Sequence, residues 1–534
     1  MPGWNFADVW EVVAETLPDE IAQVHGDRRY TWNEFDERAD GVGQWLLGIG
    51  VGRQDKVAQY LYNCPEYLES ILGIWKAGTV PVNTNYRYGD EELVYLWDNA
   101  DAVAVVFHGA FTERIAGLRD RVPNIRGWLW VDDGSGPCPE WADPYEDVAK
   151  LATGRCTPPW GRDGDDLYML YTGGTTGMPK GVMWRQDDIF STINGTSGGV
   201  KYPESGSLDD VRAALTGPGG AVLPACPLMH GTGAFTSFAS LCSGGSVVTL
   251  TQRTYSPEEL LSAIDANKVK MIAIVGDAFA KPMLRALDAE PDRWDLSSLF
   301  AIVSSGVMWS EQTKQGLLKH QPRMLCVDAF SSSEALGMGS SISTAGGAAR
   351  TAKFTLGENA IVITEDGKRV EPGSGEIGMV AVKGRTPVGY YKDKAKSDAT
   401  FKTIDGERYS IPGDFATVAA DGTLELLGRG SVCINTGGEK VFPEEVEEAL
   451  KTAPNVRDAV AVGVPDEKFG QAIIAMVELA PGETLDEAAV IAHVKTKLAS
   501  FKAPKRVLQV DTIGRAANGK VDYKRMTAEA EARV

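Results

Sequence analysis

The chain contains 534 residues, more than one hydrophobic core usually supports, so we expect at least two folding units. Its hydrophobic fraction of 43% and charged fraction of 24% are typical of globular proteins and exclude collagen-like, coiled-coil and disordered classes. The formal net charge of −20 opposes binding to nucleic-acid backbones and to anionic lipid surfaces.

The cysteines and the N-terminal residues narrow the class of protein further. Seven cysteines without CxxC pairs or zinc-finger spacing argue against a disulfide framework and a structural zinc site. The segment Met1–Asp8 has no basic region before an apolar stretch, and no window reaches the roughly 18 apolar residues of a membrane span. We therefore expect a cytoplasmic protein with no membrane span and no nucleic-acid partner.

Apolar runs that alternate with amphipathic stretches predict an α/β fold for most of the chain. The first such unit has a strand at Val57–Tyr62, a helix at Glu66–Lys76 and a strand at Thr79–Val82. The pattern continues at Val103–Phe107, Val247–Leu250, a helix from Pro257 and Met271–Val275. Between about 357 and 428, Gly and Asp cluster in short strand-turn units, which predicts a β-rich subdomain.

A compact α+β unit is predicted after the β-rich part. Its expected elements are a helix near Pro443–Lys451, strands near Ala459–Gly463 and Ile473–Val477, and a helix near Leu485–Leu498. The predicted fold is therefore a large N-terminal domain of α/β subdomains plus a β-rich subdomain, followed by a small C-terminal α+β domain.

The segment Asp166–Gly181 is an apolar strand that runs into a loop of glycines, threonines and one lysine. Glycines let backbone N–H groups approach phosphate oxygens, the threonines add donors, and Lys180 adds a positive charge. It is not the common P-loop, because Lys180 follows Met-Pro and precedes Gly181. Three threonines, four glycines and a lysine within ten residues favour a polyphosphate site over a plain turn.

This loop resembles the phosphate-binding signature of the adenylate-forming superfamily, which includes acyl-CoA synthetases, peptide-synthetase adenylation domains and beetle luciferases. The resemblance implies that the loop binds ATP and that Thr172 and Lys180 take part in catalysis. The loop residues expected to contact the nucleotide are Thr172, Gly173, Gly174, Thr175, Thr176, Gly177 and Lys180.

Further signatures follow in the family's order. The segment Phe330–Glu334 is similar to the family's aromatic-small-x-hydroxyl-Glu motif, which implies that Glu334 is catalytic and binds the Mg²⁺ that bridges ATP phosphates. Tyr409–Asp414 resembles the motif whose aspartate accepts hydrogen bonds from the ribose hydroxyls. The other nucleotide contacts implied by the resemblance are Ser305, Gly306, Asp328, Ala329, Phe330, Ser333, Asp414, Arg429 and Lys520.

The last signatures lie in the C-terminal part of the chain. Asn435–Val446 is similar to the family's C-domain signature, where Gly437, Gly438 and Lys440 would line the passage of coenzyme A. Ala517–Lys520 is similar to the motif whose catalytic lysine contacts the carboxylate and the α-phosphate during adenylation.

The resemblance also implies a domain division, with an N-terminal domain at 1–428 (its β-rich part at about 357–428), a hinge at 429–433 and a mobile C-terminal domain at 434–534. The pivot position is Ser431, where relatives commonly have Asp or Lys, and the approach to Lys520 reads Ile-Gly-Arg-Ala rather than the more usual Leu-Pro-Arg-Thr. The first departure puts the kinetics of the hinge in doubt but not the reaction class.

The activity that the resemblance implies has two steps. A carboxylate attacks the α-phosphorus of ATP and releases pyrophosphate, and the thiol of coenzyme A then attacks the acyl-adenylate. The expected cofactors and partners are ATP, Mg²⁺, coenzyme A and a small-molecule carboxylic acid, while the oligomeric state stays open, with a homodimer as one option.

The expected acyl pocket lies on Pro227–Phe238, which contains no carboxylate to pair with an amino-acid ammonium group. Its expected residues are His230, Gly231, Gly276 and Ser331. His230 is either a gate of the pocket or a core residue. At Ser331, short-chain relatives carry a tryptophan, so a serine predicts room for acids of medium length or longer.

The narrower resemblance is to actinobacterial ligases of long-chain fatty acids and sterol side-chain acids. Fatty acyl, steroid side-chain and aryl acids all stay open at this point. Two rival functions also stay open: a luciferase-like oxygenase acting on the acyl-adenylate, and a stand-alone enzyme that loads an acyl carrier protein.

Overall fold

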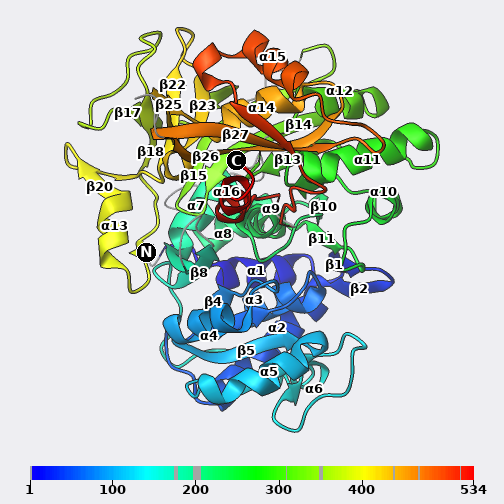
Figure 1. Cartoon of the computed structure of the whole chain (residues 1–534). Coiled ribbons are helices and arrows are strands. Elements are labelled where there is room, and N and C mark those ends of the chain that lie inside the picture. The colour runs from blue at the N-terminus through cyan, green and yellow to red at the C-terminus, as the bar shows by residue number, and fades with distance from the viewer. Residues whose placement is uncertain are drawn as a thin grey trace. The chain divides into compact units, whose positions relative to one another are not determined.

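The computed structural model of the chain describes residues 3–172, 178–196, 202, 206–307, 309–347, 353–436, 439–466, 470–516 and 519–534. The chain forms two compact units. The larger unit contains Met1–Gly173, Met178–Thr351 and Lys383–Ser410, and the smaller contains Gly174–Gly177, Ala352–Val382 and Ile411–Val534. Figure 1 traces both units from the blue N-terminal helices to the red C-terminal helix.

The first sheet of the larger unit is parallel from β8 to β7, and β9 and β19 extend it in the antiparallel sense. Its strands, in spatial order, are β19 (Gly389–Tyr390), β9 (Lys180–Arg185), β8 (Leu167–Thr172), β4 (Val80–Asn83), β3 (Lys56–Tyr60), β5 (Ala102–His108), β6 (Gly127–Val131) and β7 (Asp143–Pro144). The helices between these strands are α2 (Trp32–Gly48), α3 (Pro65–Lys76), α4 (Asp90–Asn99), α5 (Thr112–Leu118) and α6 (Tyr145–Ala149).

The second sheet of the larger unit is parallel from β1 to β14. Its strands, in spatial order, are β2 (Arg28–Thr31), β1 (Ile21–His25), β11 (Ser246–Thr249), β10 (Ala221–Pro224), β12 (Met271–Ile274), β13 (Ala301–Ser305), β14 (Leu325–Ser332) and β15 (Ala335–Ser343). Its helices are α1 (Phe6–Thr16), α7 (Gln186–Thr196), α8 (Leu208–Ala214), α9 (Gly231–Cys242), α10 (Pro257–Ala266), α11 (Asp277–Ala289) and α12 (Glu311–His320). The strand-helix alternation confirms the predicted α/β pattern.

Helix α1 lies in the main core of the larger unit, in contact with α3 on one side and α9 on the other (Figure 1). Phe6 stacks on Trp75 with ring centroids 4.9 Å apart, and Trp10 meets the same ring edge-on. Phe238 of α9 completes this aromatic cluster. Large, fully buried rings of this kind dominate the energy of a core, so the two sheets are joined by a well-packed layer of helices.

A buried lysine ends α3. Its ammonium lies 2.7 Å from Asp36 Oδ1 and 2.6 Å from Asp40 Oδ1, and Glu11 is 3.4 Å away. Lys76 itself is fully buried. Burial is the main reason why the pKa of Asp36 is raised to about 6, although Lys76 opposes the shift.

The smaller unit begins with an antiparallel sheet in the order β16 (Lys353–Leu356), β23 (Leu424–Arg429), β22 (Asp414–Val418) and β18 (Gly378–Lys383), with β17 (Ala360–Ile363) paired to β18. In the larger unit, the short elements α13 (Lys394–Thr400), β20 (Phe401–Ile404) and β21 (Glu407–Ser410) follow β19. The strands between 353 and 429 agree with the predicted β-rich character of this part of the sequence.

The C-terminal part of the smaller unit is an α+β fold, as predicted. Its sheet has the order β25 (Glu439–Val441), β24 (Ile434–Thr436), β27 (Gly470–Leu479) and β26 (Val456–Asp466), with β28 (Arg506–Gln509) also paired to β27. Alternate residues of β26 face two cores, with Ala459 and Ala461 on one side and Val460 and Val462 on the other. Helices α14 (Pro443–Lys451) and α15 (Glu487–Lys497) contribute to the first core, and α16 (Tyr523–Glu531) contributes to the second.

All seven cysteines are free thiols, and five of them are buried: Cys64, Cys156, Cys226, Cys242 and Cys326. Burial raises the pKa of Cys226 and of Cys242 to about 12. Among the described residues, no helix is long and apolar enough to cross a membrane.

Candidate active site

The ends of the glycine-rich loop are fixed by the pairing of β8 with β9. Thr172, the last residue of β8, is paired with Lys180, the first residue of β9. The loop residues Gly173, Gly174, Thr175, Thr176 and Gly177 lie outside the described part of the chain. The structure therefore places the two ends of the expected phosphate loop opposite each other.

Asn83, at the end of β4, joins this region to the expected acyl pocket. Its side-chain amide accepts a 2.6 Å hydrogen bond from Tyr171 N and donates 2.9 and 2.8 Å hydrogen bonds to the carbonyls of Tyr171 and Met229. Met229 directly precedes His230, which is half-buried and is the N-cap residue of α9. Asn83 is fully connected inside the fold, so it fixes the chain before His230 against the end of β8.

The ammonium group of Lys180 forms an ion pair with Asp393, the residue that caps α13. The second oxygen of Asp393 accepts a 2.9 Å hydrogen bond from Lys396 N. The hydrogen bond from Lys180 is the main reason why the pKa of Asp393 is lowered. A carboxylate is thus held beside the lysine that is expected to bind phosphate.

Glu334 lies in the turn between β14 and β15. Two hydrogen bonds are made to Glu334 itself, and a third is made to the preceding residue. Tyr390 Oη donates to Glu334 Oε1 at 2.8 Å, and Ser410 Oγ donates to the Glu334 carbonyl at 2.6 Å. Trp184 Nε1 donates to the carbonyl of the preceding Ser333 at 2.8 Å.

Strands β9 and β19 bring the two motifs together. Tyr390, which contacts Glu334, is paired with Val182 in β9, the strand that starts at Lys180. Asp393, which contacts Lys180, follows Tyr390 by three residues. The short segment from Tyr390 to Asp393 therefore contacts both the phosphate-loop lysine and the expected metal-binding carboxylate.

The remaining expected sites of the larger unit lie along one edge of the second sheet. Neighbouring strands β10, β12, β13 and β14 are parallel, so their carboxyl ends meet at the same edge. The expected residues His230 and Gly231, Gly276, Ser305 and Gly306, and Asp328, Ala329 and Phe330 lie at or after these ends. Open α/β sheets bind their ligands at this edge.

Three local contacts order this edge. Gly276 has a φ of 56°, which favours glycine, and its N–H donates a 2.9 Å hydrogen bond to Ser304 Oγ. Asp328 is buried and forms an ion pair with Lys314 of α12, which the sequence did not indicate. Burial raises the pKa of Asp328, and Lys314 opposes the rise. Ser331 is half-buried, and its Oγ accepts a 3.2 Å hydrogen bond from Gly337 N.

Other expected residues belong to the smaller unit. Asp414 begins β22 and is paired with Arg429 at the end of β23, so the predicted ribose contact lies opposite another predicted nucleotide contact in the sheet. Lys520 is exposed and precedes α16. Gly437 and Gly438, as well as the side chains of Arg429, Ser431 and Lys440, lie outside the described residues.

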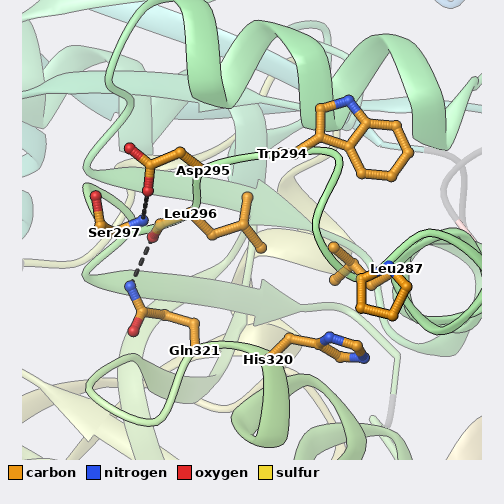
Figure 2. Close-up of a pocket in the computed structure, with 8 residues that line it drawn as sticks. Leu287, Trp294, Asp295, Leu296, Ser297, His320 and Gln321 are labelled. Atoms are coloured by element: carbon orange, nitrogen blue, oxygen red, sulfur yellow. Dashed lines mark hydrogen bonds between the residues drawn. The ribbon is translucent and has the colours of Figure 1, made fainter.

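The larger unit also contains a cavity of about 240 Å³, whose lining residues are drawn in Figure 2. It is lined by the end of α11, the segment 291–297 before β13 and the residues His320 and Gln321 before β14. Inside it, Gln321 Nε2 donates a 2.6 Å hydrogen bond to the Leu296 carbonyl. The cavity lies at the amino ends of β13 and β14, the opposite edge from the candidate active site.

The comparisons with known proteins agree with this geometry. The family model described as AMP-binding enzyme matches residues 10–391, and the model described as AMP-binding enzyme C-terminal domain matches residues 445–520. This chain belongs to the AMP-binding enzyme family. The first match includes Lys180 and Glu334, and the second ends at Lys520.

Individual members of the family resemble this AMP-binding enzyme over nearly its whole length. A protein of Mycolicibacterium smegmatis named "Medium/long-chain-fatty-acid--CoA/3-oxocholest-4-en-26-oate--CoA ligase" is 40% identical over 532 residues, or 97% of this chain and 95% of that protein. A "3-oxocholest-4-en-26-oate--CoA ligase" of Rhodococcus rhodochrous is 40% identical over 535 residues, with the same coverage of 97% and 95%.

Solved structures show the same fold. The anthranilate CoA ligase AuaEII in complex with anthranoyl-AMP superposes with a TM-score of 0.85 at 22% identity and covers 100% of this chain and 99% of its own. ATP-bound MatB from Rhodopseudomonas palustris has a TM-score of 0.81 at 24% identity and covers 98% and 99%. The predicted fold class is therefore confirmed.

Proposed function

We propose that this protein is an AMP-forming acyl-CoA ligase, which activates a carboxylic acid with ATP and transfers the acyl group to coenzyme A. In the first step, a carboxylate oxygen bonds to the α-phosphorus of ATP while the bond to pyrophosphate breaks. In the second step, the thiolate of coenzyme A bonds to the acyl carbonyl carbon, and AMP leaves with the electron pair of the broken C–O bond.

The observation that carries this proposal is the meeting of two distant motifs at β9 and β19. Lys180 follows the glycine-rich loop, and Glu334 lies in the turn after β14, yet the segment from Tyr390 to Asp393 contacts both. Such a pair fits the binding of a polyphosphate, because the lysine attracts the phosphate oxygens and the carboxylate accepts their cation.

Glu334 fits the role of a Mg²⁺ ligand. Its carboxylate is half-buried, and the hydrogen bond from Tyr390 fixes the orientation of one oxygen. Among the described residues there is no cluster of three or more metal-binding side chains, which agrees with an ion that is coordinated largely by ATP phosphates and water. When bound there, Mg²⁺ would neutralise charge on the phosphates of ATP.

In the smaller unit, we assign the ribose contact to Asp414 and the adenylation lysine to Lys520. Asp414 is 6% exposed and lies opposite Arg429 in the sheet. Lys520 would neutralise the charge that builds up when the carboxylate attacks the α-phosphate. The hinge at Ser431 and the coenzyme A passage at Gly437 and Gly438 are proposed from the family resemblance alone.

For the acid, we propose a medium- or long-chain fatty acid or a bulky steroid side-chain acid. One relative at 40% identity is named for both classes of acid, and the other is named for 3-oxocholest-4-en-26-oate. The segment from Pro227 to Phe238 contains no carboxylate, which disfavours an amino acid as the substrate. Because those full-length relatives are named as coenzyme A ligases, transfer to coenzyme A is favoured over the oxygenase and carrier-protein alternatives.

Pyrophosphate release over a panel of acids, with and without coenzyme A, tests this function. The panel contains acetate, octanoate, palmitate and 3-oxocholest-4-en-26-oate. We expect pyrophosphate release to depend on the acid. We expect acyl-CoA to form only when coenzyme A is present. Oxygen uptake without thioester formation would support the luciferase-like alternative, and acylation of a carrier protein but not of coenzyme A would support the other. If none of the acids on the panel gives pyrophosphate release, the proposal is contradicted.

A further inference from the structure

The side chain of Arg515 forms the centre of a hydrogen-bonded cluster in the smaller unit. Its Nε and Nη2 donate to the two carboxylate oxygens of Asp458 at 2.6 and 2.9 Å, and Nη2 also donates to the Ala459 carbonyl at 3.2 Å. Its Nη1 donates to the Gly519 carbonyl at 3.2 Å. One guanidinium thus joins the start of β26 to the residue before Lys520.

Two backbone hydrogen bonds link the residues on either side of 517–518, which lie outside the described part of the chain. Ala516 N donates to the Lys520 carbonyl at 2.9 Å, and Gly519 N donates to the Ala516 carbonyl at 2.8 Å. Gly519 has a φ of 71°, a conformation that favours glycine. Because the side chain of Arg515 holds the carbonyl of Gly519, the guanidinium fixes the position of the backbone next to Lys520.

The contact between Arg515 and Asp458 is well protected from water. The side chains are 16% and 22% exposed, so their charges are less screened than those of a surface pair. Burial favours the neutral form of Asp458, but the hydrogen bonds and charge of Arg515 lower the pKa of Asp458 overall. A bidentate pair of this kind also fixes direction, because the planar guanidinium matches the carboxylate in one orientation.

Neighbouring contacts anchor the far side of Lys520. Tyr523, the first residue of α16, donates a 2.8 Å hydrogen bond to Glu447 Oε1, and the same oxygen accepts a 3.2 Å hydrogen bond from Ala461 N. Lys451 approaches Asp458 at 3.9 Å. Lys520 therefore lies between two anchored points that are both attached to β26 and α14.

We propose that Arg515, together with Asp458, is a positioning residue for Lys520 in the adenylation step. This inference rests on the proposed function, in which Lys520 contacts the carboxylate and the α-phosphate. The reacting groups need placement within about 1 Å, and a misplacement of that size costs up to about a hundredfold in rate. Arg515 acts through the backbone of Gly519 and does not itself contact the substrate.

The test compares the two half-reactions in Arg515→Lys and Asp458→Asn. Lysine keeps the positive charge but lacks the fork that reaches both Asp458 and Gly519. We expect Arg515→Lys to slow acid-dependent pyrophosphate release by about tenfold or more, and Asp458→Asn to act in the same direction with a smaller effect. Thioester formation from pre-made acyl-adenylate should stay within about twofold of wild type, since Lys520 serves only the first step.

The control variant is Arg457→Lys, which changes the residue next to Asp458. Arg457 is 57% exposed and pairs at 3.3 Å with Glu478 on the neighbouring strand, so both half-reactions should remain at wild-type rates. Hydrogen exchange provides a readout that does not depend on activity. The amides of Ala516 and Gly519 should exchange faster in Arg515→Lys than in Arg457→Lys, because the guanidinium no longer holds the Gly519 carbonyl.

The outcomes separate this inference from the proposed function. Equal losses in both half-reactions, or unchanged exchange of the Ala516 and Gly519 amides, would mean that Arg515 only stabilises the fold. If Lys520→Ala abolishes adenylation while Arg515→Lys does not slow it, the positioning role is wrong and the proposed function stands. If wild type forms no acyl-adenylate with any acid, the proposed function fails, and the role of Arg515 fails with it.

Discussion

The two units hold their candidate catalytic lysines in different ways. In the larger unit, the ammonium of Lys180 itself meets a counter-ion, Asp393. In the smaller unit, the Arg515–Asp458 pair holds the backbone beside Lys520. The first arrangement controls the charge around a lysine, and the second controls its place. Loss of Asp393 from the larger unit should therefore alter ATP binding. Loss of the Arg515–Asp458 pair from the smaller unit should alter the rate of adenylation.

The largest expected effect is that of Lys520→Ala. Loss of one preorganised charge at the reacting centre should lower acid-dependent pyrophosphate release by about 10²–10³-fold. Thioester formation from pre-made acyl-adenylate should be largely retained, because this charge is used only while the α-phosphate is attacked. Single-turnover measurements of each half-reaction check this prediction. Equal losses in both half-reactions would mean that Lys520 does not serve adenylation alone.

Ser331→Trp tests whether the larger unit selects the acid. An indole at this half-buried position should block the pocket for long acids while sparing short ones. Each buried methylene contributes about 0.8 kcal/mol, so kcat/KM for palmitate should fall by about tenfold or more relative to acetate. The matched control is Ser340→Trp, at an exposed position on β15. An unchanged chain-length profile in Ser331→Trp would place the acyl pocket elsewhere.

Tyr390→Phe removes the hydroxyl that orients Glu334 and keeps the ring. We expect the Mg²⁺ concentration for half-maximal adenylation to rise by about tenfold or more, since a hydrogen bond to a charged group contributes about 1.5–3 kcal/mol. Tyr391→Phe is the control, because Tyr391 Oη makes a similar 2.7 Å hydrogen bond to a different carboxylate, Asp101. If both variants need the same Mg²⁺ concentration, Tyr390 has no role in the metal site.

A smaller effect is expected for Asp393→Asn, which removes the counter-ion of Lys180. Asparagine caps a helix about as well as aspartate does, so α13 should keep its start. Without the competing carboxylate, the triphosphate of ATP should bind more easily, and KM for ATP should fall by about two- to fivefold. A rise in KM would show that Asp393 positions Lys180 for ATP rather than competing with it. Measuring KM at low and high salt checks the electrostatic origin.

Asp36→Asn should affect stability and leave the reaction unchanged. Because burial raises the pKa of Asp36 to about 6, against about 3.9 in an unfolded chain, the native state binds more protons between these values. Stability therefore falls as pH rises from about 4 to 6, by an amount on the order of 2 kcal/mol for this group.

The asparagine variant should flatten this part of the pH profile and raise the thermal midpoint at pH 7.5. Lys76 keeps Asp40 at 2.6 Å as a charged partner in this variant. The exposed Asp19 supplies the control variant, Asp19→Asn, for which we expect no change. A lower midpoint for Asp36→Asn at pH 7.5 would mean that Lys76 needs both nearby carboxylates.

Local patterns in the sequence were sufficient to predict several elements with nearly correct bounds. The predicted helix Pro443–Lys451 has the bounds of α14, and the predicted helix Glu66–Lys76 begins one residue after α3 does. The strand predicted at Val57–Tyr62 ends two residues too late, because apolarity continues past the last ladder pair of β3 at Tyr60. The predicted family is confirmed by the two family models.

The side-chain partners of the site could not be predicted in the same way. The contacts of Lys180 with Asp393 and of Glu334 with Tyr390 arise because β19 pairs with β9, and that pairing joins segments far apart in the sequence. No periodic pattern encodes which short strands will meet. The roles assigned to the site residues, the domain boundaries at 428 and 434, the homodimer and the cytoplasmic location stay predictions.

The buried cysteines have a practical consequence for the study of a thiol-using enzyme. Only thiolates react readily with disulfide reagents, and burial that raises the pKa of Cys226 and Cys242 to about 12 keeps them protonated as well as inaccessible. A chromogenic disulfide reagent added to the native protein should therefore report the free thiol of coenzyme A with little background from the five buried cysteines. Colour beyond that expected from Cys138 and Cys433, which are not fully buried, would signal that the enzyme is unfolding.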